Sequence, residues 1–236
     1  MNALRASAIL ALLLAMPAFA QDYAEQRADL VDEIRHYANL VDGEPLRADV
    51  LESLNTVERH NFVPSREIPY AYENRPLSIG WGQTISQPYI VALMTDLLEP
   101  EPGHVVLEVG TGSGYQAAVL SGLVEHVYTI EIIEPLAEEG GERLRRLGFD
   151  NVSTRLGDGY FGWEEHAPFD SIIVTAAATH VPPPLIEQLK KGGRMVIPVG
   201  ARFMTQWLLL IEKDDDGRVV TRQIAPVRFV PLTGKR

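Results

Sequence analysis

The residues with the clearest chemical potential lie between Val105 and Tyr115, in the stretch Val-Val-Leu-Glu-Val-Gly-Thr-Gly-Ser-Gly-Tyr. An apolar run there ends in three glycines that alternate with hydroxyl residues, and a helix-compatible segment follows. Gly110, Gly112 and Gly114 lack a Cβ atom, so the backbone can turn sharply and approach a ligand closely. An apolar run, a glycine turn and a helix are typical of the first βα unit of an open parallel sheet. The pattern therefore predicts a ligand-binding loop at the end of a strand.

The spacing of these glycines indicates which ligand fits. Tyr115 stands where a dinucleotide-binding G-x-G-x-x-G loop requires its third glycine, which argues against a bound pyrophosphate. A second apolar run, residues 126–130, ends at Glu131, which lies 21 residues after Gly110. A carboxylate at this place accepts hydrogen bonds from both ribose hydroxyls of an adenosine. These features suit S-adenosylmethionine, and the alternative is an ordinary glycine turn with a surface glutamate.

Two further segments carry candidate site residues. Asp158 stands between two glycines after the apolar run 151–156, where it can accept a hydrogen bond from an adenine amino group; a turn aspartate is the alternative. Residues 79–88 read Ile-Gly-Trp-Gly-Gln-Thr-Ile-Ser-Gln-Pro and precede a helical run. A loop of this kind delivers polar side chains to one place, although Ser86 also suits the cap of the next helix.

The composition bounds the function. The chain has 236 residues, a net charge of −11 and no cysteine, with 46% hydrophobic and 22% charged residues. The acidity argues against sequence-independent nucleic-acid binding, which needs a basic surface. The missing thiols exclude disulfides, thiolate catalysis and thiolate zinc sites. The six histidines have no metal-ligand spacing, so no metal is expected.

The first 20 residues have the features of a cleavable secretory signal. Arg5 precedes the apolar run Ala6–Met16, and the sequence Pro-Ala-Phe-Ala then ends at Ala20. The apolar run is shorter than the ~20 residues of a spanning helix, and no cysteine follows for a lipid anchor. We therefore expect a signal peptide over residues 1–20 and export, with the periplasm as destination. The protein would be cytoplasmic if the signal were not used.

Hydrophobic periodicity predicts an α/β fold, a Rossmann-like doubly wound sheet with an N-terminal helical appendage and a C-terminal antiparallel hairpin. The expected domains are the signal, residues 1–20, an N-terminal helical segment with the 84–88 loop, residues 21–98, and the Rossmann-like core, residues 99–236. Residues 70–78 are expected as a loop. Helices are expected over residues 22–41, 49–59, 89–98, 116–121, 136–147 and 182–191, the last stopped by the glycines at 192–193. Strands are expected over residues 105–109, 126–130, 151–156, 171–174, 195–198, 206–211 and 227–230, the last two joined in a hairpin across residues 214–217.

From about residue 50 to 234 the chain resembles the protein-L-isoaspartate O-methyltransferases. The glycine loop is shared with many methyltransferases, so it is a weak marker of this family. The segments Gly-Trp-Gly-Gln-Thr-Ile-Ser-Gln-Pro and Arg-Phe-Val-Pro-Leu are much more specific. The matching stretches are residues 59–64, 80–88, 106–118, 128–132, 157–160, 169–177, 188–200 and 227–233.

This resemblance implies methyl transfer from S-adenosylmethionine to the free carboxylate of L-isoaspartyl residues in damaged proteins. The resulting ester would cyclise to a succinimide and reopen in part to normal aspartyl. The resemblance places the family's catalytic serine at Ser86, and residues 230–233 near the substrate peptide. It implies cofactor contacts at Thr84, Ile85, Gly110, Thr111, Gly112, Ser113, Glu131, Asp158 and Gly159.

The residue types agree with that chemistry. A free carboxylate has a pKa near ~4 and needs no general base at neutral pH, so the site must supply mainly alignment and exclusion of water. Ser86 would then orient the carboxylate rather than act as a nucleophile, since a serine hydrolase also requires an adjacent base. Arg59, Arg66 and Arg75 are candidates to offset the acidic net charge near the substrate, or else they are solvated or form structural ion pairs.

Other functions remain open from the sequence. An exported protein that binds an adenosyl ligand or a peptide with little turnover is one alternative, because S-adenosylmethionine is made in the cytoplasm. An NAD-dependent oxidoreductase is disfavoured by the glycine spacing and by the absence of an evident proton donor. The expected partners are proteins or peptides with L-isoaspartyl residues, without nucleic acid or stable membrane insertion after signal cleavage. We expect a monomer.

Overall fold

The computed structural model of the chain describes residues 18–41, 45–201 and 204–234. Of the expected signal segment, residues 1–20, the first 17 lie outside the described residues. Ala18 is the first residue of helix α1 (Ala18–Val41), which is longer at its start than expected. No helix in the described ranges is both long and apolar enough to cross a lipid bilayer.

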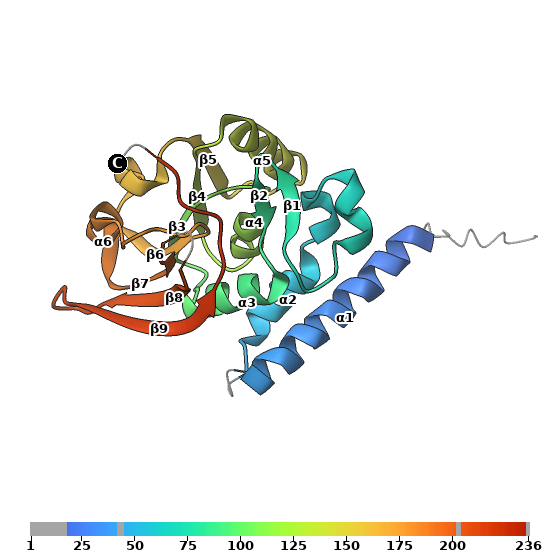
Figure 1. Cartoon of the computed structure of the whole chain (residues 1–236), viewed down its shortest axis with the longest axis horizontal. Helices are drawn as coiled ribbons and strands as arrows, with labels where there is room; N and C mark the ends of the chain where they lie inside the picture. Colours follow the sequence, from blue (N-terminus) through green and yellow to red (C-terminus); the bar gives the residue numbers. More distant parts are fainter. Residues whose placement is uncertain (1–17, 42–44, 202–203, 235–236) are drawn as a thin grey trace, which may run out of the picture.

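A seven-stranded sheet forms the centre of the fold (Figure 1). Its strand order is β5-β4-β3-β6-β7-β8-β9, parallel from β5 to β7 and antiparallel from β7 to β9. The chain runs outward from β3 to β5 on one side and then returns to β6 on the other side of β3. The boundary between β3 and β6 is therefore the topological switch point, where open α/β sheets bind ligands. The strands are β3 (Val105–Val109), β4 (His126–Glu131), β5 (Val152–Leu156), β6 (Phe169–Val174), β7 (Leu189–Val199), β8 (Gln206–Lys213) and β9 (Val219–Val227).

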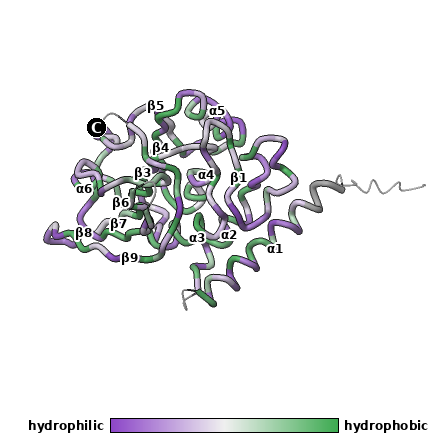
Figure 2. The backbone as a smooth tube through the Cα atoms, viewed as in Figure 1, coloured by the Kyte–Doolittle hydropathy of each residue, from purple (hydrophilic) through white to green (hydrophobic). Residues whose placement is uncertain are grey.

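Both faces of this sheet are covered, as a doubly wound fold requires. Alternate residues of β3 point to opposite faces, because successive side chains of a strand alternate. Val106 belongs to a hydrophobic cluster that also contains buried residues of helices α1 to α5. Leu107 belongs to a second hydrophobic cluster, which contains Leu185 of α6. Figure 2 shows the apolar strands at the centre and alternating polar and apolar stretches along α1. The helices are α2 (Ala48–Thr56), α3 (Pro88–Leu97), α4 (Tyr115–Ser121), α5 (Glu134–Arg146) and α6 (Pro183–Gln188), with short 3-10 turns η1 (Arg59–Phe62), η2 (Ser65–Tyr70), η3 (Gly159–Phe161) and η4 (Glu164–His166).

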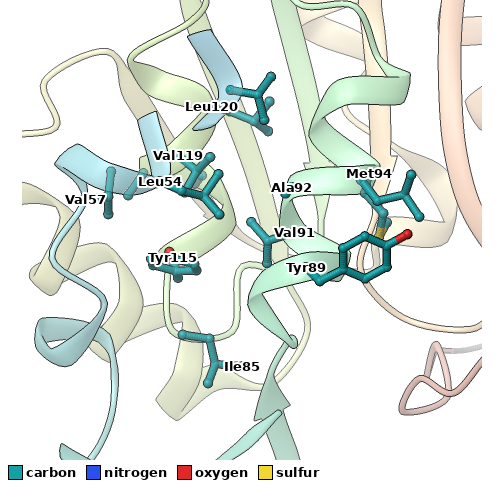
Figure 3. Packing of buried hydrophobic residues seen from close by; sticks show 14 of the residues in the cluster. Leu54, Val57, Ile85, Tyr89, Val91, Ala92, Met94, Tyr115, Val119 and Leu120 are labelled. Carbon is teal, nitrogen blue, oxygen red and sulfur yellow. The ribbon is translucent and has the colours of Figure 1, made fainter. Parts of the chain in front are cut away.

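The N-terminal helices share their apolar core with the helices that cover the sheet. Ile34 of α1 and Leu54 of α2 are buried in the same cluster as Leu120 of α4. Figure 3 shows side chains from α2, α3 and α4 gathered together, with Ile85 at one edge of the group. This packing fixes the segment that carries Ser86 against the helix that follows the glycine loop.

The helix expected over residues 182–191 is wrong in its second half. α6 ends at Gln188, and Leu189 begins β7, where it pairs with Phe169. The glycines that were expected to stop a helix lie inside this strand, next to an irregular register between β6 and β7. Gly192 has a φ of 77°, and a Cβ atom on Gly193 would lie 2.8 Å from the Asp170 carbonyl oxygen. These glycines therefore accommodate a strand irregularity.

Two other expectations are corrected. The last strand is β9 at residues 219–227, whereas 227–230 was expected; its hairpin with β8 is confirmed. The segments 70–78 and 79–88, expected as loops, contain a small antiparallel hairpin of β1 (Leu77–Gly80) and β2 (Gln83–Ile85). Gly80, Trp81 and Gly82 form its turn, with φ angles of 93°, 54° and 71°. The hairpin gives Ser86 a fixed position directly after a strand.

Candidate active site

The glycine loop lies at the switch point between β3 and β6. Gly110, Gly112 and Gly114 have positive φ angles of 101°, 52° and 89°. Residues with a Cβ atom rarely adopt such backbone conformations. A Cβ atom on Gly110 would lie 2.4 Å from the hydroxyl oxygen of Thr175, which follows β6. That hydroxyl donates to the Gly110 carbonyl at 2.7 Å. The loop therefore presents main chain, with no side chain in between, to the space in front of the sheet.

Glu131 ends β4 and is bonded to this loop. Its Oε2 accepts a hydrogen bond from the Gly112 amide at 2.8 Å. Its Oε1 accepts from the amides of Ile132 and Ile133, at 2.9 Å each. The carboxylate is thus held in one orientation beside the loop, and its oxygens keep capacity for further donors such as ribose hydroxyls.

Three spaces meet in front of the glycine loop. An inner chamber of about 60 Å³ is lined by Glu131, Gly159 and the strip of residues 230–233. A loop chamber of about 40 Å³ is lined by residues 84–86 and by the glycine loop from 110 to 113. An open groove of about 1060 Å³ extends from Ser86 along residues 226–231. Thr84 and Thr175 line all three spaces, so these two residues mark their junction.

The predicted site residues are thereby brought together with one exception. The inner chamber is lined by Thr84, Gly110, Gly112, Glu131 and Gly159, and the loop chamber by Thr84, Ile85, Ser86, Gly110, Thr111, Gly112 and Ser113. Asp158 lines neither chamber. Its Oδ1 accepts from the Tyr160 amide at 3.0 Å, and its carboxylate faces Gly234, on which a Cβ atom would lie 2.3 Å from Oδ2. Gly234 thus lies against the carboxylate of the residue expected to meet the adenine.

The strip of residues 230–233 closes the inner chamber. The Ala177 amide donates to the Val230 carbonyl, and the Leu232 amide donates to the Ala177 carbonyl, at 2.8 Å each. The side chain of Gln206 bonds both the amide and the carbonyl of Phe229, just before the strip. The strip is therefore held as an additional extended segment over the ends of the central strands.

Glu108, which has no distinguishing sequence signal, is a fully buried acid in β3. Its Oε2 accepts from the Thr129 hydroxyl, while Oε1 has no hydrogen-bond partner among the described residues. Burial raises the pKa of this carboxyl to about 8, and the nearby Glu131 charge adds to the rise. Since Glu108 also lines the loop chamber, that chamber contains an acid that is mainly uncharged at neutral pH.

The three arginines expected to offset charge near the substrate have different positions. Arg66 pairs with Glu67 and Arg75 pairs with Glu73, and neither lines the open groove. Arg59 is fully buried, with its Nη2 donating to the Ser86 carbonyl at 2.8 Å. The cation that does line the groove is Arg228, which makes no ion pair within the described residues. The sequence indicated it only as part of the Arg-Phe-Val-Pro-Leu segment.

The site residues fit an adenosyl cofactor. The glycine loop leaves main chain exposed to the chambers, and the Glu131 carboxylate is fixed in the wall of the inner one. A Cβ atom on Gly159 would lie 2.3 Å from Val109, so this wall is also restricted to glycine. The two chambers are smaller than the roughly 300 Å³ of typical ligand sites. A bound cofactor would therefore also occupy part of the adjoining open groove or displace a wall of these chambers.

Comparison with known sequences gives a consistent result. The family model for protein-L-isoaspartate(D-aspartate) O-methyltransferase matches residues 25–236. A protein-L-isoaspartate O-methyltransferase 1 from Cupriavidus necator is 63% identical over 216 residues, which cover 90% of this chain and 83% of the relative. A protein-L-isoaspartate O-methyltransferase 2 from Polaromonas sp. is 70% identical over 187 residues, covering 79% of this chain and 89% of the relative.

Solved structures agree with the sequence comparison. A protein-L-isoaspartate O-methyltransferase superposes with a TM-score of 0.79 at 30% identity, covering 88% of this chain and 66% of that chain. A second such structure, from Plasmodium falciparum and in complex with S-adenosyl-L-homocysteine, has a TM-score of 0.73 at 25% identity. It covers 88% of this chain and 98% of that chain.

Proposed function

Because the chain belongs to the protein-L-isoaspartate(D-aspartate) O-methyltransferase family, we propose that the junction marked by Thr84 and Thr175 is its methyl-transfer site. The protein is an S-adenosylmethionine-dependent carboxyl methyltransferase that acts on L-isoaspartyl residues of damaged proteins and starts their repair through a succinimide. One observation carries the assignment of the site. The chambers beside the glycine loop and the open groove beside Ser86 share these two threonines, so a ligand and a peptide would meet there.

The proposed binding roles follow from the geometry. The amides of the glycine loop and the Glu131 carboxylate would hold the cofactor, with Gly159 against its adenosine and Asp158 reached once the strip moves. When bound, S-adenosyl-L-methionine supplies a methyl group activated by the positive charge on sulfur. The loop chamber, where Thr111 and Ser113 are buried, would exclude water from the reacting atoms.

Ser86 is proposed to orient the acceptor carboxylate. It lines both the loop chamber and the open groove, which supports a position of its hydroxyl between the two ligands. The carboxylate is already ionised at neutral pH and requires no general base. The contribution of Ser86 is therefore alignment, which demands reacting atoms about 3–3.5 Å apart.

Paired peptides test this function. We expect base-labile methyl incorporation into an isoaspartyl peptide and little into its aspartyl twin, with kcat/KM at least ~10-fold lower in Ser86→Ala, since alignment is lost. The exposed Ser65→Ala is the matched control and should equal the wild type. Wild-type protein that binds S-adenosyl-L-homocysteine without turnover would instead support the alternative, a binding protein with little activity.

We also propose that residues 1–20 direct export to the periplasm and are then removed. We propose separately that the processed protein is a monomer. The support for export is the charged start, the apolar run and the small residues before Gln21. Cell fractionation with mass spectrometry of the purified N-terminus tests this directly. Periplasmic protein that begins at Gln21 is the expected result, and uncleaved protein confined to the cytoplasm would contradict it. Light scattering of the processed protein at the monomer mass is expected; a dimer mass would contradict that part.

A further inference from the structure

Arg59 is a buried cation directly behind Ser86. Its side chain is 0% exposed, and its Nη2 donates to the Ser86 carbonyl at 2.8 Å. The guanidinium carbon lies 4.8 Å from the centre of the Tyr115 ring. Among the side chains that the structure describes it forms no ion pair, and its Nε and Nη1 have no hydrogen-bond partner there. The guanidinium is thus a buried charge without a counter-charge.

Such a charge is unfavourable for folding. Burying an ion without a paired partner costs free energy, and apolar residues of similar volume are often at least as stable in its place. Burial lowers the pKa of Arg59 to about 10, so the group still carries its charge at neutral pH. Its hydrogen bond to the Ser86 carbonyl and its position over the Tyr115 ring offset part of this cost, but no counter-charge among the described side chains balances the guanidinium.

The positive charge of Arg59 would act on a substrate carboxylate bound beside Ser86. Ser86 and Tyr115, which the guanidinium contacts, both line the loop chamber. The acid in the wall of that chamber, Glu108, is mainly protonated at neutral pH and does not neutralise the guanidinium. Glu131 is separately held by three main-chain amides. An incoming carboxylate beside Ser86 would therefore supply a counter-charge that these two acids do not.

We propose that Arg59 is the positioning residue that makes the acceptor site select an ionised carboxylate. It fixes the Ser86 main chain through its hydrogen bond to the carbonyl. Its positive charge also attracts an ionised substrate carboxylate more strongly than a neutral substrate group of the same shape. The proposal rests on the proposed function, because it assumes that the acceptor lies beside Ser86. It differs from a purely structural role, which would alter stability rather than the preference for charge.

The test compares an isoaspartyl peptide with its isoasparagine analogue, the neutral amide of the same shape. Affinities of both are measured with S-adenosyl-L-homocysteine present, for wild type, Arg59→Lys and Arg59→Met. We expect the wild type to bind the acid at least ~10-fold more tightly than the amide, which is about 1.4 kcal/mol. Arg59→Lys should keep most of this preference, and Arg59→Met should lose it. Exposed Arg66→Met is the matched control and should behave as the wild type.

Two further measurements on Arg59→Met separate the outcomes. Arg59→Met should melt within about 3 °C of the wild type, since an apolar side chain replaces an unpaired charge. Its affinity for S-adenosyl-L-homocysteine should stay within about twofold of the wild-type value. This result would exclude that Arg59 binds the carboxylate of the cofactor. Equal wild-type affinity for acid and amide, an unchanged ratio in Arg59→Met, or equal loss of cofactor and peptide binding would each overturn the proposal. Absence of wild-type methyl transfer to the isoaspartyl peptide would instead refute the proposed function.

Discussion

Replacing Glu108 by glutamine should flatten the dependence of stability on pH. In the folded protein this carboxyl is fully buried and its pKa is raised to about 8, from 4.5 for a free side chain. Between these two values the folded state holds one proton more than the unfolded state. The free energy of unfolding therefore falls as pH rises through this window, by up to about 1.4 kcal/mol per pH unit.

The total effect is large enough to measure. Over the window from 4.5 to about 8 the loss sums to roughly 5 kcal/mol, which is a substantial part of the stability of an ordinary domain. Glu108→Gln removes this titration while keeping the shape of the side chain. The difference in unfolding free energy between variant and wild type should therefore shift in favour of the variant with rising pH.

Urea unfolding at several values between about pH 5 and 8 provides the assay. The exposed Glu52→Gln is the matched control and should run parallel to the wild type. Burial lowers the pKa of His60 and His126, which adds a slope of opposite sign, but this slope is common to all three proteins and cancels in the difference. A Glu108→Gln curve parallel to the wild-type curve would refute the view that this acid is buried in its neutral form.

Two other substitutions probe the binding surfaces. Gly110→Ala should weaken S-adenosyl-L-homocysteine binding at least ~10-fold, as measured by calorimetry. The new Cβ atom would lie 2.4 Å from Thr175, and the backbone at Gly110 has a left-handed conformation that alanine rarely adopts. Gly103→Ala is the control, because its Cβ atom would meet no neighbour, and it should bind as the wild type does. Normal binding by Gly110→Ala would contradict the role of the loop. Arg228→Gln should raise the KM for an acidic isoaspartyl peptide about threefold and reduce the salt dependence of KM, because Arg228 lines the open groove. Arg218→Gln is the control and should change neither quantity, because Arg218 pairs with Asp216 away from the groove lining. Identical salt dependence in wild type and Arg228→Gln would argue against a substrate contact.

The sheet and the glycine loop were predictable because their signals are local. The apolar run of β3, the glycines and Glu131 follow one another at the spacing that a βα unit requires, and the structure places Glu131 in a hydrogen bond with Gly112. The resemblance then located Ser86. In the structure Ser86 lines the loop chamber together with residues of the glycine loop. Whether Ser86 acts as proposed stays a prediction.

The errors arose where one local signal serves two structures. A pair of glycines after an apolar helical pattern usually marks a helix end, but Gly192 and Gly193 occupy a strand irregularity fixed by pairing with β6. The end of α6 is set by a distant contact. The Gln188 side chain accepts from the Trp163 amide and donates to the Phe161 carbonyl, both at 2.8 Å. Such partners are not visible in a local pattern.

Three site residues could not be singled out from the sequence. Thr175 looked like one small residue after an apolar strand and Glu108 like one acid within an apolar run. Arg59 was one of three arginine candidates, with nothing to rank it above the other two. Their importance depends on burial and on neighbours far along the chain, as with Arg59 and Ser86, which are 27 positions apart. Only the folded structure brings these groups together.

A crystal structure with S-adenosyl-L-homocysteine and an isoaspartyl peptide tests the account most directly. We expect the ribose on Glu131, the sulfur at the junction marked by Thr84 and Thr175, and the Ser86 hydroxyl within hydrogen-bond distance of the peptide carboxylate. The strip of residues 230–233 should lie further from Gly159 than it does here. A ligand bound away from the glycine loop, or a Ser86 side chain pointing out of the crevice, would contradict the account.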